Sequence, residues 1–128
     1  MDLSQILRTV LFQTGNDPED LGDLQPFLTN AVNEGYDRLL MAWAGKHLHD
    51  DDCPPLRRDR DTPEGLPDWL HPYLADYASY KLCRGGSGQK QTRAQNFFAA
   101  FADGLGRARS ATGRPRADLP QRFCNLPR

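Results

Sequence analysis

Apolar residues recur every three or four positions through most of the first 108 residues, a spacing typical of amphipathic helices. The first stripe predicts a short helix over residues 2–13 and consists of Leu3, Ile6, Leu7, Val10 and Leu11. Turn-forming residues from Thr14 to Gly22 interrupt the pattern. No segment alternates apolar and polar residues with a period of two, so the pattern predicts no strand.

A second, longer helix is predicted from about Asp23 to about Lys46. Asp23 is a suitable capping residue, and Pro26 is tolerated in a first turn. One face of this helix carries Leu28, Val32, Tyr36, Leu39 and Trp43. Gly35 lies in its interior, where glycine costs ~1 kcal/mol relative to alanine, so we expect a close helix contact there.

The segment from Leu66 to Arg109 predicts two more helices joined by a glycine-rich linker. Residues 67–70 can form one helical turn. Pro72 disfavours helical backbone at His71, so the third helix is expected to start at Pro72. Its core stripe is Leu74, Ala78 and Leu82. Gly85 or Gly86 is expected to adopt the left-handed conformation that ends it.

In the fourth helix, Ser87 is the expected cap. The apolar positions are Ala94, Phe97, Phe98, Phe101, Leu105 and Ala108. The linker is short, which favours antiparallel packing of the third and fourth helices, with Phe97, Phe98, Phe101, Leu74 and Trp43 in the core. The sequence therefore predicts an all-α bundle of three long helices and a short N-terminal helix, with a body over residues 1–108.

Two segments lack any periodicity. Residues 49–67 contain four prolines and many charged groups, and loops of this length are usually functional or disordered. Residues 109–128 combine arginines and prolines with few apolar residues, which predicts an extended C-terminal arm.

The formal net charge of −1 hides a gradient along the chain. Residues 1–54 carry ten acidic side chains against Arg8, Arg38 and Lys46, whereas residues 107–128 carry six arginines against Asp118. This asymmetry favours binding of the C-terminal end to acidic surfaces. It disfavours contact between the N-terminal half and DNA phosphates.

The cysteines indicate no disulfide framework. Cys53, Cys83 and Cys124 are odd in number and widely separated, which favours reduced thiols in a cytosol. The N-terminus does not resemble a signal peptide, and no apolar run approaches the ~18 residues of a membrane span. We therefore expect no membrane association.

Catalytic and metal motifs are weak. His47, His49, Asp50 to Asp52 and Cys53 supply metal-ligand atoms, but no further ligand follows at a recognisable spacing. The GGSGQK segment departs from a phosphate-binding loop, and no nucleophile or acid-base motif is visible. The chain is predicted to be no enzyme and to hold neither a cofactor nor a metal. A small metal-dependent enzyme stays open as a rival reading.

A second rival is a DNA-binding protein of the helix-turn-helix type. Polar residues able to contact bases and phosphates begin the fourth helix after a glycine-bearing turn, namely Gln89, Lys90, Gln91, Thr92, Arg93, Gln95 and Asn96. However, a DNA reader is normally basic, whereas residues 1–106 are net acidic.

The C-terminal arm is the strongest candidate for a binding element. Its cations alternate with prolines and single apolar side chains, a pattern suited to an extended segment on an acidic, pocketed protein surface. The candidate contact residues are Arg107, Arg109, Arg114, Arg116, Arg122, Phe123, Leu126 and Arg128.

The body resembles the head-to-tail connector, or adaptor, proteins of tailed bacteriophages. The resemblance covers roughly residues 20–108 and lies in three segments: LQPFLTNAVNEGYDRLL, then LPDWLHPYLADYASYKL, and KQTRAQNFFAAFADGL after the Gly-rich turn. The motif P-x-W-x-H-x-x-L-x-x-Y-A is the most specific part of the resemblance.

The resemblance implies a helical virion protein of the phage neck that is made in the host cytoplasm. It would form a homo-oligomeric ring beneath the portal protein, commonly a dodecamer, and present a surface to the next tail or neck component. Genome DNA would pass through the channel without specific binding, and the basic arm would bind the portal. The arginine tail and the loop at residues 49–67 depart from a minimal adaptor.

Overall fold

Helices make up the ordered framework of this protein. The computed structural model describes residues 1–112, and within this range it contains four α-helices, two 3-10 turns and no strand. In chain order these are α1 (Leu3–Thr14), η1 (Pro18–Asp20), α2 (Leu21–Ala44), η2 (Asp68–Leu70), α3 (His71–Cys83) and α4 (Gln89–Ala111). The prediction of an all-α fold is confirmed. No helix among the described residues is long and apolar enough to span a membrane.

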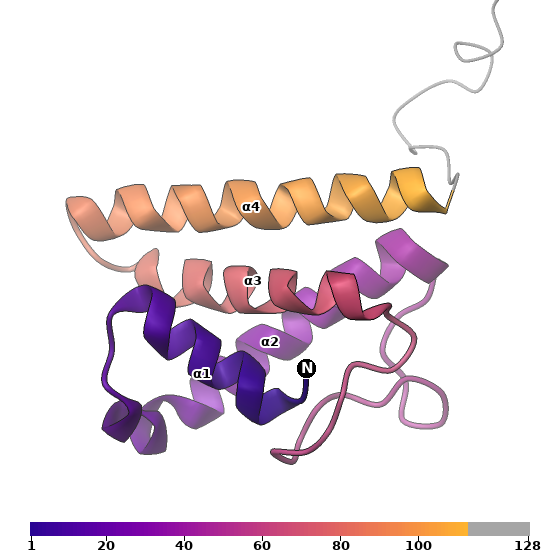
Figure 1. Cartoon of the computed structure of the whole chain (residues 1–128), viewed down its shortest axis with the longest axis horizontal. Coiled ribbons are helices and arrows are strands. Elements are labelled where there is room, and N and C mark those ends of the chain that lie inside the picture. The colour runs from indigo at the N-terminus through magenta and orange to yellow at the C-terminus, as the bar shows by residue number, and fades with distance from the viewer. Residues whose placement is uncertain (113–128) are drawn as a thin grey trace, which may run out of the picture.

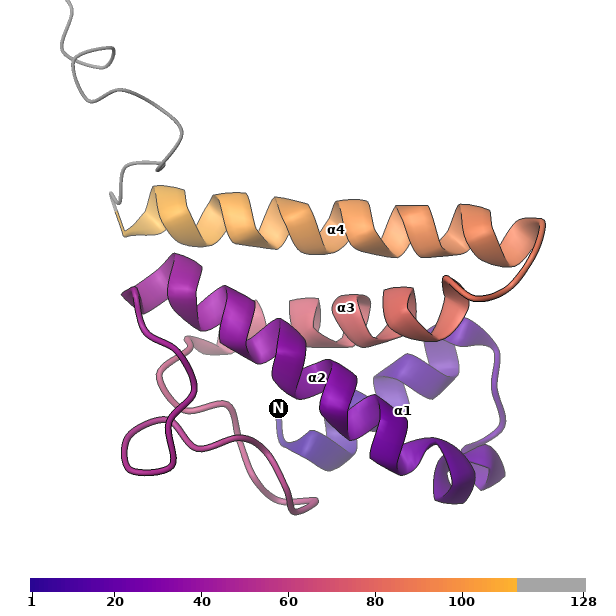
Figure 2. The same ribbon diagram turned by 180° about the vertical axis from the view of Figure 1, so that it is seen from behind.

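The third helix, α3, is the centre of the bundle and packs against each of the other three α-helices. α4 runs beside α3 as an outer layer in the opposite direction, as Figures 1 and 2 both show, so the predicted hairpin is confirmed. α1 lies on the other side of α3, and α2 crosses behind it to reach α4 with its C-terminal half.

The core gathers side chains from all four helices and from the segment between α2 and η2. The largest fully buried side chains include Tyr36, Phe101, Leu3, Ile6, Leu7, Leu28, Leu39, Leu40, Leu56, Leu70 and Leu74. The expected close contact at Gly35 is present. A Cβ at this position would lie 3.0 Å from the Cβ of Tyr77, so α2 and α3 approach closely here.

The start of α3 differs from the prediction. His71, and not Pro72, is the first residue of α3, and its backbone is helical because η2 runs directly into the helix. Pro72 lies in the first turn, where a backbone N–H has no acceptor within the helix. The missing N–H of proline therefore costs no helical hydrogen bond. The local preference of the residue before proline is therefore overridden.

The α3–α4 turn also differs from the prediction. Neither Gly85 nor Gly86 has a positive φ; Gly88 does, at 61°, and it takes the capping position of α4 that we expected for Ser87. At the start of α2, Asp23 lies in the first turn instead of capping the helix, because η1 leads straight into Leu21.

Not every residue predicted for the core is fully buried. Phe98 is 40% exposed, and Phe97 and Trp43 are only partly buried. The reason is that α4 is an outer layer with a narrow buried face, which consists of Ala94, Phe101, Gly104 and Ala108. Phe101 and Leu74 are fully buried, as predicted.

Candidate docking surfaces

The segment between α2 and η2 is attached to the core. Asn33 of α2 donates to the carbonyl of Leu56 at 2.9 Å and accepts from its N–H at 2.7 Å. The hydroxyl of Tyr36 donates to the carbonyl of Glu64, and the side chains of Cys53 and Leu56 are buried. Of the two readings open for residues 49–67, functional or disordered, these contacts support an ordered surface element.

The tip of this loop is a tight turn around Asp61. The Asp61 carboxylate accepts the N–H groups of Arg57 and Arg58 at 2.9 and 2.8 Å. These bonds hold the pKa of Asp61 below its usual value. The carbonyls of Asp59 and Asp61 in turn accept the N–H groups of Ser4 and Leu3, so the tip also covers the start of α1.

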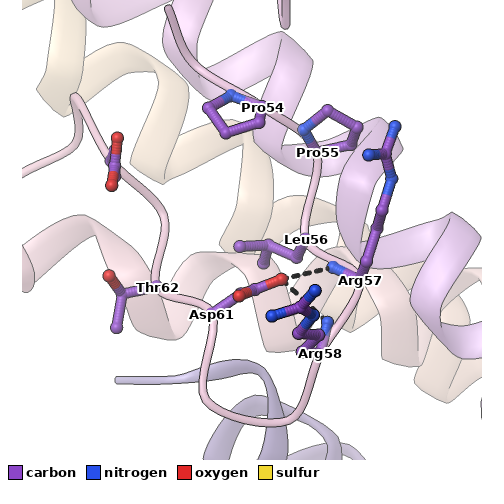
Figure 3. A pocket seen from close by; sticks show the side chains of 8 residues that line it. Pro54, Pro55, Leu56, Arg57, Arg58, Asp61 and Thr62 are labelled. Carbon is purple, nitrogen blue, oxygen red and sulfur yellow. Dashed lines mark hydrogen bonds between the residues drawn. The ribbon is translucent and has the colours of Figure 1, made fainter. Parts of the chain in front are cut away.

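A hollow of about 250 Å³ opens in this loop (Figure 3). It is lined by Pro54, Pro55, Leu56, Arg57, Arg58, Asp61, Thr62 and Glu64, and is called the loop hollow below. The proline rings lie along one side of it, and the Arg58 side chain lies across from them next to Asp61. The lining combines an apolar wall with two arginines and two carboxylates, so the hollow carries no net charge.

The most exposed large apolar side chain among the described residues belongs to Phe12, at 87%. It borders a groove of about 400 Å³ lined by Arg8, Leu11, Phe12, Asn16, Pro18 and Leu21. The exposed carboxylates of Asp17, Glu19 and Asp20 follow within eight residues. Phe12 and these three carboxylates are called the Phe12 surface below.

The sequence interpretation missed the Phe12 surface. Phe12 falls outside the stripe that ends at Leu11, so periodicity assigned it no role. The available signal is a large aromatic residue on the polar side of a predicted helix, because an exposed apolar patch often marks a contact surface.

Two other exposed aromatic side chains, Trp69 and Phe98, are partly covered by neighbouring rings, whereas Phe27, at 46% exposed, makes no ring contact among the described residues. Trp69 is 46% exposed but packs edge-on against Trp43 with the ring centroids 6.0 Å apart. The ring of Phe98 lies 4.8 Å from that of Tyr80. No such ring contact involves Phe12 within residues 1–112.

The side chains considered as metal ligands point to different partners. Asp52 pairs with Lys46 at 2.9 Å, and Asp50 pairs with Arg57 at 3.2 Å. His47 lies 3.1 Å from Asp37, while the Cys53 thiol is buried beside Gly65. Among residues 1–112 no three His, Cys, Asp or Glu side chains converge on a site for a metal ion.

The segment Gln89–Asn96 does not have the geometry of a recognition helix. In a helix-turn-helix the two helices cross at roughly 90–120°, whereas α3 and α4 lie antiparallel (Figures 1 and 2). The Arg93 guanidinium donates to the carbonyl of Gln13 at 2.6 Å, and Ala94 is buried. Arg93 therefore connects α4 to the end of α1.

Two of the predicted portal-contact residues lie on α4. Arg107 is exposed and pairs with Asp103 at 2.8 Å, and Arg109 lies in the last turn of the helix, which continues to Ala111. α4 ends near the C-terminal end of α2. The remaining candidates lie outside the described residues, namely Arg114, Arg116, Arg122, Phe123, Leu126 and Arg128. Cys53 and Cys83 are buried and form no disulfide within residues 1–112, while Cys124 also lies outside this range.

Comparisons with models of protein families, with curated proteins and with solved structures found no match. The function of this chain is therefore inferred from the residues and their arrangement.

Proposed function

We propose that this chain is the subunit of a head-to-tail adaptor of a tailed bacteriophage. In this role it forms a ring under the portal protein, extends the DNA channel and joins the capsid to the next neck or tail component. The protein acts structurally in the virion neck and catalyses no reaction.

One observation carries the proposal. The three segments that resemble adaptor proteins pack into one helical unit: the first lies in α2, the second covers η2 and most of α3, and the third lies in α4. α3 packs against both α2 and α4, so the segments depend on one another for their burial. A compact unit of this kind suits a subunit whose function is to present surfaces.

The distribution of charge supports passage of DNA without specific binding. Residues 1–54 carry ten acidic side chains and three cationic ones, and Asp17, Glu19, Asp20 and Asp23 are exposed. Few exposed cations mean few phosphate contacts, and phosphate contacts supply most non-specific affinity for DNA. A channel lined by this half would release DNA readily.

The arm is the proposed portal-binding element, together with Arg107 and Arg109 of α4. The test is truncation after Thr112, which keeps the bond from the Thr112 hydroxyl to the Ala108 carbonyl and so preserves the last turn of α4. We expect helicity by circular dichroism to be unchanged, while co-sedimentation with portal particles from the same phage is lost or strongly weakened.

A matched control is the full chain with Arg84→Ala. Arg84 is an exposed arginine in the α3–α4 turn, at the opposite end of α4 from the arm. It should co-sediment like the unaltered chain. If the truncated chain co-sediments equally well, the arm is not the portal contact. If the full chain does not bind portal particles at all, the adaptor function is wrong.

A further inference from the structure

We propose that the start of the C-terminal arm docks on the helical body of its own chain. The docking site consists of two indole rings and a carboxylate, those of Trp43, Trp69 and Asp68, and is called the tryptophan surface below. Its ligands are the guanidinium groups of Arg114 and Arg116, which lie outside the described residues.

Trp69 presents an indole ring to solvent. Its side chain is 46% exposed, and its ring packs edge-on against Trp43 with the centroids 6.0 Å apart. Trp43 is partly buried against the core and holds Trp69 in place. In an edge-on pair each ring keeps at least one face that the other ring does not cover. Such a face suits the planar guanidinium group of arginine, which stacks on indole rings.

The carboxylate of Asp68 lies next to Trp69 in the chain and is fully exposed. Its only ion-pair contact within residues 1–112 is with the ring of His71, at 4.0 Å. Residues 61–80 carry four carboxylates and neither lysine nor arginine. An arginine that stacks on an indole can also donate to a carboxylate beside it, a combination that lysine and apolar side chains do not provide.

The tryptophan surface lies at the end of the bundle where the arm begins. Trp43 is the last residue but one of α2, and Trp69 lies in η2, directly before α3. α4 runs antiparallel to α3, so its last turn lies beside the start of α3 and the C-terminal end of α2 (Figures 1 and 2). The chain that follows Thr112 therefore starts next to the two indoles.

Distance along the chain selects two of the four arginines beyond Thr112. At up to ~3.6 Å per residue, Arg114 and Arg116 lie within about 7 and 14 Å of Thr112, whereas Arg122 and Arg128 can be about 36 and 58 Å away. A segment tethered this closely has a high effective concentration at the surface. The first two arginines of the same chain are therefore favoured over the distal ones and over a separate chain.

Pro115 favours a common direction for the two arginines. The residue before a proline prefers extended backbone, and side chains two positions apart in an extended chain point to the same side. Arg114 and Arg116 can therefore face the tryptophan surface together, one over an indole ring and the other at Asp68.

Docking of these two arginines leaves the distal part of the arm for the portal. The candidates beyond Arg116 are Arg122, Phe123, Leu126 and Arg128. A fixed starting point lowers the cost of ordering these residues when the portal binds. In this respect the inference rests on the proposed function, whereas the contact itself involves only this chain.

Tryptophan fluorescence reports on the contact directly, because Trp43 and Trp69 are the two tryptophans of the chain. Quenching by acrylamide, which is uncharged, is measured on the full chain and on variants, with circular dichroism to confirm folding. Truncation after Thr112 should raise the quenching constant and shift the emission to longer wavelength, because the indoles become more exposed.

Full-chain variants locate the contact within the arm. Arg114→Ala combined with Arg116→Ala should raise the quenching constant as truncation does. The matched control, Arg122→Ala with Arg128→Ala, removes two arginines from the same arm and should leave the constant unchanged. Asp68→Asn should raise the constant in the full chain and have no further effect in the truncated chain.

The proposal is overturned if the truncated chain is quenched no more than the full chain, or if the distal control raises the constant as much as the proximal change. It is also overturned if Asp68→Asn has the same effect with and without the arm. Protection that disappears on dilution would show that the arm covers the tryptophans of a second copy, which contradicts docking within one chain.

Co-sedimentation with portal particles separates this contact from the adaptor function. If truncation leaves the quenching unchanged but the full chain binds the portal, the contact is wrong and the adaptor function stands. If the arm protects the tryptophans but the full chain does not bind the portal, the contact stands and the adaptor function fails.

Discussion

Gly104 of α4 lies directly against the ring of Tyr73 on α3. A Cβ at position 104 would come within 2.5 Å of the Cγ of Tyr73, closer than real side chains approach. The two helices can pack at this distance only because residue 104 has no side chain. The packing of the α3–α4 hairpin therefore depends on this glycine.

Gly104→Ala is expected to destabilise the protein by about 1–3 kcal/mol, because the overpacked methyl group must displace Tyr73 or move α4. The measurement is the free energy of unfolding in denaturant, compared between proteins whose free energies depend on denaturant concentration with the same slope. Gly106→Ala is the control. No described residue lies within 4 Å of a Cβ at this position, so only the helix preference of alanine acts, and it should raise the free energy of unfolding by up to ~1 kcal/mol. Equal stabilisation by both substitutions would mean that the close contact does not exist.

Phe101 and Phe98 should respond differently to truncation. Phe101 is fully buried with its ring 4.6 Å from that of Tyr77, so Phe101→Ala should cost about 3–5 kcal/mol through lost burial and a cavity. Phe98 is 40% exposed, and Phe98→Ala should cost less than half as much. Similar losses for both, measured by denaturant unfolding, would contradict the outer position of α4.

His71 should make stability depend on pH. The side chain is buried and its Nε2 lies 3.1 Å from the carbonyl of Leu66; burial lowers the pKa of His71 below its usual value. The unfolded chain therefore binds a proton more readily than the folded one. The stability that neutral His71 provides is complete above the unfolded pKa of about 6.5 and is lost as the pH falls below it.

The measurement for His71 is the free energy of unfolding between about pH 7.5 and pH 5.5, a window above the ordinary carboxyl pKa values. His71→Gln keeps a donor for the Leu66 carbonyl and cannot titrate. The variant should therefore show a smaller pH dependence. An identical profile in both proteins would assign the pH dependence to other groups.

Binding to duplex DNA should be weak. We expect a dissociation constant no tighter than the non-specific range of roughly 10⁻⁴ to 10⁻⁶ M in gel shifts at about 150 mM salt. Arg93→Ala should lower stability, because it removes the bond to the Gln13 carbonyl, and should leave DNA binding unchanged. A nanomolar complex that is lost with Arg93→Ala or Asn96→Ala would support the helix-turn-helix reading instead.

The sequence was sufficient to predict the helices and their pairing. Heptad-like stripes such as Leu28, Val32, Tyr36 and Leu39 mark a buried face without any knowledge of the partner helix. The helix ends were less predictable. A residue before proline usually avoids helical backbone, and a glycine such as Gly85 often ends a helix in the left-handed conformation. Here η2 continues through His71 into α3, and the left-handed residue is Gly88.

The candidate surfaces were harder to predict, for a physical reason. Periodicity indicates which side of a helix is apolar but does not show how much of that side its neighbours cover. The pattern therefore predicts a buried Phe98 and no role for Phe12, whereas Phe98 is 40% exposed and Phe12 is 87% exposed. The loop hollow depends on long-range bonds from Asn33 and Tyr36, which no local pattern contains.

The bonds from the loop tip to Leu3 and Ser4 have a consequence for hydrogen exchange. The first amides of a helix usually have no helical acceptor and exchange rapidly with solvent. Here the amides of Leu3 and Ser4 are bonded to Asp61 and Asp59, and that of Gln5 to the Asp2 side chain. The Leu3 and Ser4 protons should exchange only when residues 57–61 detach, so their protection reports on opening of a loop more than 50 residues away in the sequence.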